Sequence, residues 1–562
     1  MDNLTITQAE RVRNSLTGRY FERFLGVWQD SKGHSAARLR IVFFGGLALI
    51  FGVTALIGAV PTRIYGHDIF IYLGNGWRVL NGQRPHVDFT SPWGPVGFLV
   101  SALGLRISHY SVVGIGYGSA IFALMVGTWC FFLGKNRLTS SPRLILSFFL
   151  AALVASPYPL GLLPFFSSYA MLYNRYGYAL LGLVLLESFS VVRRPTGSRK
   201  DDWIAGISTG AALSLSLFLK ASFFFMGVAL IVILAVFLGR FSVQRILGML
   251  LGFFVVSLCL LAYLHFDVAA VLRDLRMAAG ARAETMKFPI WIILYHWPVL
   301  LGAVLFGAAA ALLLGNRSPQ WAGLKLPILG AIFFFADIGL IRSNAQSDGF
   351  LVCAVFAILV VNEVTRDQQG LPTAEAHSYR PAYAAVLALA ALLFIPQFAS
   401  DLVGLAYGAW QKERPSHAEA LLRFTSPNLK PLLLYESDDN PPSEGRMFTN
   451  YVNDGVALLE RETRPDETIL TMDVTNPFPY AMERRPARGG HACSTYDYNM
   501  NDEFRPSDDW YFGDADIVMV PKRPSQGDNH YTGFYKAYGP GLKQRYDLAA
   551  EDEVWWMYRR KR

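Results

Sequence analysis

The chain has little charge and almost no cysteine for its length. Asp, Glu, Lys and Arg make up only 17% of its 562 residues, against 52% hydrophobic residues, and its mean hydropathy is +0.29. This composition excludes an ordinary soluble enzyme and predicts an integral membrane protein. Three of the four cysteines fall inside apolar runs and only Cys493 lies beyond them, so we expect no disulfide within the C-terminal region.

Other features are also missing from the sequence. The cysteines show no metal-type spacing, and no internal repeat or basic arm is evident. The formal net charge of +8 is spread over many short loops, which suits a protein lying against anionic lipid and argues against nucleic acid. The stretch before Ile41 is polar and basic and lacks a short apolar core, so we expect no cleavable signal peptide.

Apolar runs of the length that crosses a bilayer, about 20 residues, recur from Ile41 to Ser400. The segment from Val96 to Ile107 is shorter, and we predict a helix lying in the membrane interface there. The predicted spans are eleven, at roughly 41–60, 112–134, 144–164, 171–191, 203–219, 221–239, 246–265, 292–314, 326–341, 349–364 and 381–400.

Three parts follow from this pattern: an N-terminal segment 1–40, a membrane domain 41–400 and a polar domain 401–562. Lys and Arg are more frequent on the side of the N-terminus, which predicts that this end is cytoplasmic. An odd number of spans then places the C-terminal domain and the first long loop, 61–111, on the outer face.

The C-terminal domain shows the alternation of an α/β fold. Apolar residues at helical spacing predict a helix over 450–461. Short apolar segments predict strands at 468–474, 515–520 and 553–558.

The stretch that bears most on function is 65–97, YGHDIFIYLGNGWRVLNGQRPHVDFTSPWGPVG. It holds Asp68, a helical run to Leu80, a glycine turn, Asp88 in a Pro-His-Val-Asp step, and a Pro-Trp-Gly-Pro corner. This order resembles the first outer loop of the GT-C glycosyltransferases, multi-pass enzymes that take sugars from polyprenyl-phosphate carriers.

The resemblance implies a catalytic base at Asp68 and a second acidic position at Asp88. Where many GT-C enzymes carry adjacent acidic residues, this chain has His67-Asp68. The difference favours the metal-free branch, similar to the lipid A aminoarabinose transferases and protein mannosyltransferases. We therefore expect no cofactor, with a divalent ion shared by Asp68 and Asp88 as the alternative. A solvated or capping role remains open for both carboxylates.

A leaving phosphate needs positive groups on the same face. Arg175, Lys220 and Arg342 lie at outer ends of predicted spans and are the candidate donor-phosphate ligands. Each costs roughly 2 to 3 kcal/mol if drawn into the apolar slab. Snorkelling to the interface is the alternative for each of them. Lys220 is the strongest candidate, because it occupies a very short hairpin without an acidic neighbour in sequence.

The outer loop 265–291 is unusually basic, and an amphipathic helix is predicted over 271–279. Contact with lipid headgroups and binding of the carrier phosphate are equally good interpretations. The basic residues of this loop are Arg273, Arg276, Arg282 and Lys287.

Further candidate contacts with acceptor or substrate are His67, Trp93 and His296, although His296 also suits an interfacial anchor. In the C-terminal domain, the stretch from Asp473 to Tyr480 is either a glycan surface or an ordinary loop after a strand. Asp514-Ala515-Asp516 resembles a DxD metal motif, but it opens an apolar strand, so we expect a structural role there.

Together these features predict a membrane glycosyltransferase, hexosyl or pentosyl, inverting and metal-independent. It would move a sugar from a polyprenyl-phosphate carrier to a lipid, glycan or protein acceptor at the outer face of a bacterial inner membrane. The alternative is a multi-pass transporter or lipid flippase, which should show paired ionisable residues at mid-membrane and related halves. A non-catalytic membrane subunit would leave the carboxylates of the first outer loop without a purpose.

Overall fold

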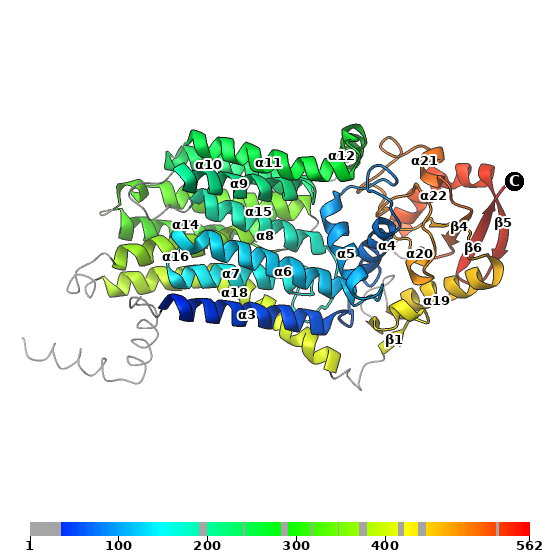
Figure 1. Cartoon of the computed structure of the whole chain (residues 1–562), viewed down its shortest axis with the longest axis horizontal. Coiled ribbons are helices and arrows are strands. Elements are labelled where there is room, and N and C mark those ends of the chain that lie inside the picture. Colours follow the sequence, from blue (N-terminus) through cyan, green and yellow to red (C-terminus); the bar gives the residue numbers. More distant parts are fainter. Residues whose placement is uncertain are drawn as a thin grey trace, which may run out of the picture.

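The protein consists of a long helical bundle with a smaller α/β domain at one end (Figure 1). The helices of the bundle run along the long axis of the molecule, and the C-terminal domain adjoins the end that carries the first outer loop. The computed structural model describes residues 35–189, 199–239, 242–282, 290–315, 318–344, 346, 348–369, 379–413, 421–436, 445–523 and 528–562.

A bundle helix lies at each of the eleven predicted spans. These helices are α3 (Ser35–Ile57), α6 (Gly114–Leu133), α7 (Ser140–Ala155), α8 (Leu172–Phe189), α9 (Arg199–Leu217), α10 (Ala221–Leu238), α11 (Val243–Tyr263), α14 (Trp297–Leu314), α15 (Lys325–Ser343), α16 (Leu351–Gln369) and α18 (Arg380–Glu413). Among the described residues, 7 helices are long and apolar enough to cross a membrane: α3, α6, α10, α11, α14, α15 and α18. The chain is an α-helical multi-pass membrane protein.

Two of the remaining bundle helices, α8 and α16, lie in the interior. Every residue of α8 is buried, and so is α16 from Leu351 to Val364. Their neighbours are other helices, so these two helices tolerate charged groups that a lipid-facing helix would not. On α11, by contrast, Phe254 is 64% exposed and Leu258 is 59% exposed, as expected for side chains that face lipid.

The last bundle helix, α18, is longer than a span requires. It has 34 residues with Pro396 in its interior, and at 1.5 Å per residue it reaches about 50 Å, against about 30 Å for the hydrocarbon core. The predicted domain boundary between Ser400 and Asp401 therefore falls inside a continuous helix. Near its end, Gln411 donates a hydrogen bond to the Tyr435 hydroxyl of the C-terminal domain at 2.7 Å.

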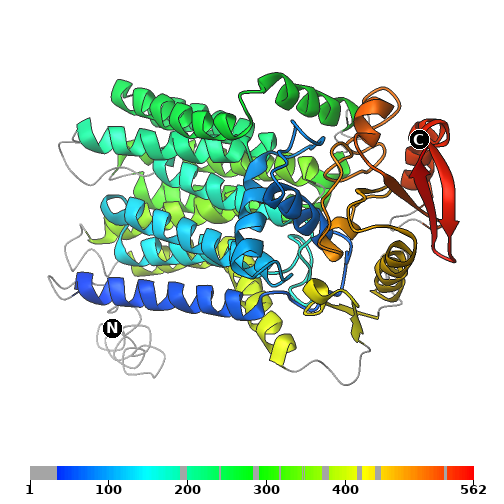
Figure 2. The same ribbon diagram turned by 45° about the vertical axis from the view of Figure 1, so that its right-hand side comes forward.

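The end of the bundle that adjoins the C-terminal domain carries shorter helices from two loops. The first outer loop forms α4 (Ile69–Leu80) and α5 (Pro95–Ile107), and the loop after α11 forms α12 (Val268–Arg282) and α13 (Ile290–Tyr295). These positions agree with the helices predicted from Asp68 to Leu80, over 96–107 and over 271–279. Figure 2 shows α12 at the end of the bundle where α4 and α5 lie.

The C-terminal domain is built on a four-stranded sheet of order β3-β4-β6-β5. Strand β3 pairs parallel with β4, and the other pairs are antiparallel. The α/β prediction is confirmed, although β3 is shorter than expected. The elements are β1 (Leu421–Arg423), β2 (Leu433–Tyr435), α19 (Gly445–Glu462), β3 (Ile469–Thr471), α20 (Phe478–Ala481), α21 (Asp508–Phe512), β4 (Ile517–Pro521), α22 (Asp528–Arg545), β5 (Tyr546–Glu551) and β6 (Trp555–Arg560).

The sheet separates two hydrophobic cores. Alternate residues of β4 point to opposite faces, as in any strand. Ile517 and Met519 belong to the core that continues into the membrane bundle, whereas Val518 and Val520 belong to a separate core within the C-terminal domain. One face of the sheet therefore shares a continuous apolar interior with the bundle, which holds the domain over the outer loops.

Candidate functional site

The first element of the site is a carboxylate and imidazole pair directly before α4. The Asp68 amide donates to the carbonyl of Tyr65 at 3.0 Å, and Asp68 occupies the N-cap position of α4. The Nε2 atom of His67 lies 3.1 Å from Oδ1 of Asp68, and His67 is only 2% exposed. Burial lowers the pKa of His67, but the charges of Asp68 and Asp473 and the hydrogen bond to Asp68 together raise it above its ordinary value.

A second carboxylate reaches this pair from the C-terminal domain. Asp473 follows β3 and is buried. Its Oδ2 accepts a hydrogen bond from the Tyr451 hydroxyl at 2.5 Å, and its Oδ1 accepts one from the Val474 amide at 2.7 Å. The ring of Phe448, one turn before Tyr451 on α19, lies edge-on to His67 at a centroid distance of 6.1 Å. Both domains thus supply acidic groups around one imidazole.

The second element is a cluster of three cationic residues, Lys220, Arg282 and Arg342. Lys220 Nζ donates to the carbonyl of Ser343 at 3.3 Å, and Arg282 donates to the same carbonyl at 2.6 Å. Arg282 also donates to the carbonyl of Arg342 at 3.3 Å and to the hydroxyl of Tyr498. These residues come from the α9–α10 hairpin, the end of α12 and the end of α15.

Lys220 is half-buried, beside neutral groups and the positive charge of Arg282. Burial, and then the charge of Arg282, lower the pKa of Lys220 well below its ordinary value. Among the described residues, no carboxylate forms an ion pair with Lys220, whose ammonium lies 4.5 Å from the centre of the Tyr173 ring. An anionic ligand at this place would restore the favourable charged form.

Tyrosine side chains connect the two elements. The phenol of Tyr173 lies near both Asp68 and Arg282, and its backbone amide donates to the Tyr72 hydroxyl at 3.1 Å. The half-buried Trp93, a predicted substrate contact, packs on Tyr173 at a ring-centroid distance of 4.8 Å. Tyr72, Tyr173 and Trp93 form one aromatic surface, here called the aromatic wall. The His67–Asp68 pair and the cation cluster both lie against it.

The Pro-Trp-Gly-Pro corner fixes the hairpin that carries Lys220. The amide of Gly94 donates to the carbonyl of Leu219 at 3.2 Å, and the amide of Val96 donates to the carbonyl of Phe218 at 3.1 Å. A Cβ atom on Gly94 would lie 2.0 Å from the Phe218 oxygen. Only glycine allows this approach of the two backbones.

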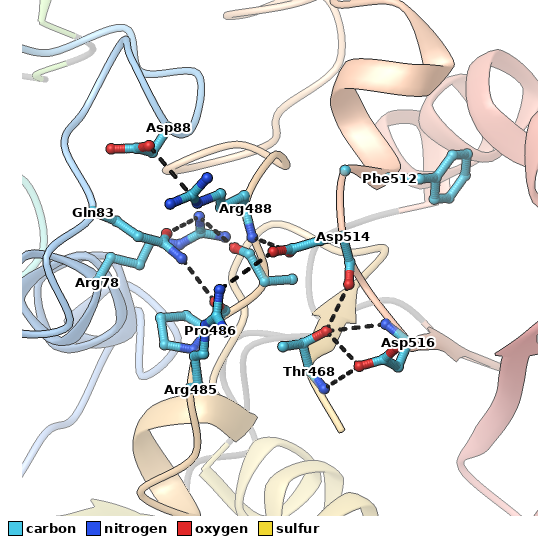
Figure 3. A network of polar contacts seen from close by, with 12 residues as sticks. Arg78, Gln83, Asp88, Thr468, Arg485, Pro486, Arg488, Phe512, Asp514 and Asp516 are labelled. Atoms are coloured by element: carbon cyan, nitrogen blue, oxygen red, sulfur yellow. Dashed lines mark hydrogen bonds and ion pairs between the residues drawn. The ribbon is translucent and has the colours of Figure 1, made fainter. Parts of the chain in front are cut away.

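Asp88, the second predicted carboxylate, lies in a different environment. Its Oδ2 accepts from the Arg84 side chain at 3.0 Å and from the Arg84 amide at 2.8 Å, and its Oδ1 lies 4.0 Å from Arg488. Its backbone carbonyl accepts a hydrogen bond from the Gly489 amide. Figure 3 shows Asp88 beside Arg488 in the contact between the first outer loop and the C-terminal domain.

The same contact is made largely by backbone acceptors of the C-terminal domain. Arg78 donates to the carbonyls of Ala487 and Gly489, each at 3.1 Å, and Gln83 donates to the carbonyl of Pro486 at 2.7 Å (Figure 3). Trp77 donates to the carbonyl of Arg484 at 2.8 Å. These bonds tie the C-terminal end of α4, and the turn that follows it, to the C-terminal domain.

The two aspartates of the DxD-like sequence make hydrogen bonds within the C-terminal domain, in line with the structural role expected from the sequence. Asp514 accepts from the Arg488 amide at 2.6 Å. Asp516 accepts from the amide of Thr468 at 2.9 Å and from its hydroxyl at 3.0 Å. Among the described residues, no three His, Cys, Asp or Glu side chains form a group that could hold a metal ion.

Two further predicted site residues lie apart from the cluster. Arg175 pairs with Asp401 at 2.8 Å and donates to the carbonyl of Tyr158 at 2.8 Å. It is only 1% exposed, so this predicted phosphate ligand instead holds α8 to α18 inside the bundle. The ring of His296 packs between those of Tyr295 and Phe350, at centroid distances of 4.8 and 5.0 Å. These aromatic neighbours suit the role of an interfacial anchor better than that of a substrate contact.

Solved structures with a similar arrangement were found, whereas no protein-family model and no curated protein matches the chain. ArnT from Cupriavidus metallidurans in the apo state is 10% identical over 93% of this chain and 98% of its own, with a TM-score of 0.44. The same protein bound to undecaprenyl phosphate is 12% identical over 92% of this chain and 97% of its own, with a TM-score of 0.43.

An archaeal oligosaccharyltransferase is also similar. AglB from Archaeoglobus fulgidus, in complex with an inhibitory peptide and a dolichol-phosphate, is 10% identical over 86% of this chain and 69% of its own, with a TM-score of 0.37. The function proposed below rests on the geometry of the site, because one fold hosts many functions.

Proposed function

We propose that this protein is a GT-C glycosyltransferase that moves a sugar from a polyprenyl-phosphate carrier to a lipid, glycan or protein acceptor. The observation that carries the proposal is the shared aromatic wall, which has the Asp68 pair at one end and the cluster of Lys220, Arg282 and Arg342 at the other. Sugar transfer requires both a base for the acceptor and positive charge for the leaving phosphate.

Asp68 acts as the base in this proposal. It takes the proton of an acceptor hydroxyl while the hydroxyl oxygen attacks the anomeric carbon of the donor. The new bond joins this oxygen to the anomeric carbon, and the bond from that carbon to the phosphate oxygen breaks with its electron pair remaining on the phosphate. Attack opposite the leaving group inverts the anomeric centre. His67 holds the orientation of Asp68 through their 3.1 Å contact.

The cation cluster receives the charge that develops on the leaving phosphate. Burial and the charge of Arg282 lower the pKa of Lys220, and an anion beside it raises that pKa again. Binding of the carrier phosphate is therefore linked to the protonation of Lys220.

The proposed chemistry uses no resident metal ion. The partner of Asp68 is the His67 imidazole, 3.1 Å away, whose pKa burial lowers and the two carboxylates raise, with a net rise. The Lys and Arg distribution supports a cytoplasmic N-terminus, with the site and the C-terminal domain at the outer face of a bacterial inner membrane.

Transfer by the purified protein in lipid tests this function. Radiolabelled polyprenyl-phosphate sugars are offered as a panel with a membrane-lipid extract as acceptor, to wild type and to Asp68→Asn, with and without chelator. We expect label in a new product with wild type only, and no effect of the chelator. No transfer by wild type from any donor, with added metal also tried, would favour the transporter or flippase alternative.

A further inference from the structure

Helix α12 contacts the first outer loop through the buried carboxylate of Asp274 and through the neighbouring Arg273. Asp274 has no exposed side-chain surface. Its Oδ2 accepts a hydrogen bond from the Ser91 amide at 2.9 Å and lies 3.0 Å from Nδ1 of His86. Its Oδ1 accepts from the neighbouring Arg273 side chain at 3.0 Å. A buried carboxylate is tolerated only with such a set of donors.

The C-terminal domain closes the same junction. Arg273 donates to the backbone carbonyl of His86 at 2.8 Å, and its guanidinium lies over the Trp510 ring at 4.5 Å. The indole nitrogen of Trp510 donates to the Thr90 hydroxyl at 3.0 Å. Three parts of the chain, namely the first outer loop, α12 and the C-terminal domain, therefore meet at Asp274.

Asp274 is the polar member of the buried side of α12. Leu272 and Arg276 are exposed, and the buried side of the helix consists otherwise of Ala270, Met277 and Ala281. Ala270, Asp274, Met277 and Ala281 recur at helical spacing and form one stripe. Asp274 contributes the polar contacts within that stripe, so it sets where the helix sits along the loop.

Arg282, the last residue of α12, belongs to the cation cluster. It lies eight residues after Asp274, which corresponds to about 12 Å along a helix. A helix segment of this length is stiff, so the position of Asp274 determines the position of Arg282.

We propose that Asp274 is a positioning residue for the carrier phosphate, acting through α12 and Arg282 and held by His86 and Ser91 of the first outer loop. The inference rests on the proposed function, because the role of Arg282 is to bind phosphate. It adds a physical link between the loop that carries the base and the helix that carries a phosphate ligand. The placement of the loop and the placement of Arg282 are thereby coupled.

The first test is carrier binding by the full chain in lipid nanodiscs, with undecaprenyl phosphate as the probe. Asp274→Asn and Arg282→Gln should each weaken binding by roughly tenfold, the equivalent of one charge-assisted hydrogen bond. The double variant should be no weaker than Arg282→Gln, because both changes remove the same interaction. Arg276→Gln, on the exposed side of the same helix, is the matched control and should bind as wild type does.

Additive losses in the double variant would overturn the proposal, since they would mean that Asp274 affects binding by another route. His86→Gln provides a second variant in case Asp274→Asn does not fold, and should show a smaller loss with the same dependence on Arg282. Full carrier binding by a folded Asp274→Asn or His86→Gln protein would also overturn it.

A distance measurement separates this proposal from the proposed function. Spin labels at Asn81 and Leu272, both exposed, report the separation of α12 from the first outer loop without any carrier, in a background in which the exposed Cys259 is replaced by serine. Asp274→Asn should broaden this distance distribution, and an unchanged distribution would overturn the positioning role. Equal carrier binding by wild type and Arg282→Gln would overturn the function proposed for the cluster, whatever the distance shows.

Discussion

The two carboxylates of the first outer loop lie twenty residues apart in sequence and in opposite chemical settings. Asp68 lies beside tyrosines and an imidazole that it shares with Asp473, whereas Asp88 lies beside two arginines and accepts from one backbone amide. The contacts of Asp88 join the loop to its neighbours, which suits a structural role. Asp68 instead contacts an imidazole, a group that can exchange a proton near neutral pH, which suits proton transfer.

The largest expected effect separates these two ends. Asp68→Asn removes the proposed base and should lower the transfer rate by about 100- to 10,000-fold. The rate is measured with labelled donor, on protein whose size-exclusion profile matches that of wild type.

Asp88→Asn is the matched substitution in the same loop. It should keep the transfer rate of wild type and lower the free energy of unfolding by about 1 kcal/mol, because its partner Arg84 is partly exposed. A loss of transfer as large as that of Asp68→Asn would return Asp88 to the catalytic role that the sequence predicts.

The second test displaces the hairpin that carries Lys220. Gly94→Ala places a Cβ atom 2.0 Å from the Phe218 oxygen and must push the Lys220 hairpin away, which costs roughly 1 to 3 kcal/mol. We expect a donor KM raised by about tenfold or more, corresponding to at least 1.4 kcal/mol, in steady-state transfer assays.

Gly97→Ala is the control for this change. Its added Cβ would meet Leu219 at 3.6 Å, an ordinary contact, so its donor KM should match that of wild type. Equal KM values for the two alanine variants would mean that the corner does not hold the hairpin.

The third test concerns the protonation of Lys220. The pKa of this lysine is lowered in the free protein by burial and by Arg282, and a bound phosphate raises it. Carrier affinity should therefore fall as pH rises above the pKa of the free protein, by up to about tenfold per pH unit, until the pKa of the complex is reached.

Lys220→Met cannot take up this proton. Its carrier affinity should be lower and independent of pH over the same interval, as measured by titration in a pH series. A pH dependence in the methionine variant equal to that of wild type would assign the proton to another group.

The smallest effect concerns folding stability. The pKa of His67 in the folded protein is raised, because the contributions of Asp68 and Asp473 exceed the opposing effect of burial. Its stabilising contribution should be fully present below about pH 6.5, the value for an unperturbed histidine, and should be lost as pH rises through the folded pKa. Thermal unfolding across this interval should show the decline in wild type, whereas His67→Gln should lack it.

Local signals in the sequence were sufficient for much of this architecture. Apolar run length predicts the positions of the bundle helices, and the first outer loop places Asp68 next to its partner His67. Lys220 stands out in the sequence because it lies between two apolar runs and has no acidic neighbour in sequence to pair with.

Contacts between distant segments could not be predicted in the same way. Arg175 has the same local signal as Lys220, but its partner Asp401 lies 226 residues further along the chain. The tyrosines of the aromatic wall carry no mark in sequence that separates them from interfacial tyrosines. Arg282 is distinguished from the other basic residues of its loop by a carbonyl that it shares with Lys220, that of Ser343, 61 residues further along the chain.

The hydrogen bonds between α4 and the C-terminal domain have a consequence for biosynthesis. The carbonyls that accept hydrogen bonds from Arg78 lie 409 and 411 residues later in the chain, and the carbonyl that accepts from Trp77 lies 407 residues later. At a synthesis rate of about 5 to 20 residues per second, roughly 20 to 80 seconds pass between the appearance of donor and acceptor. During this time the loop that carries Asp68 has left the ribosome without the surface it folds against, so the site can assemble only after nearly the whole chain has been made and inserted.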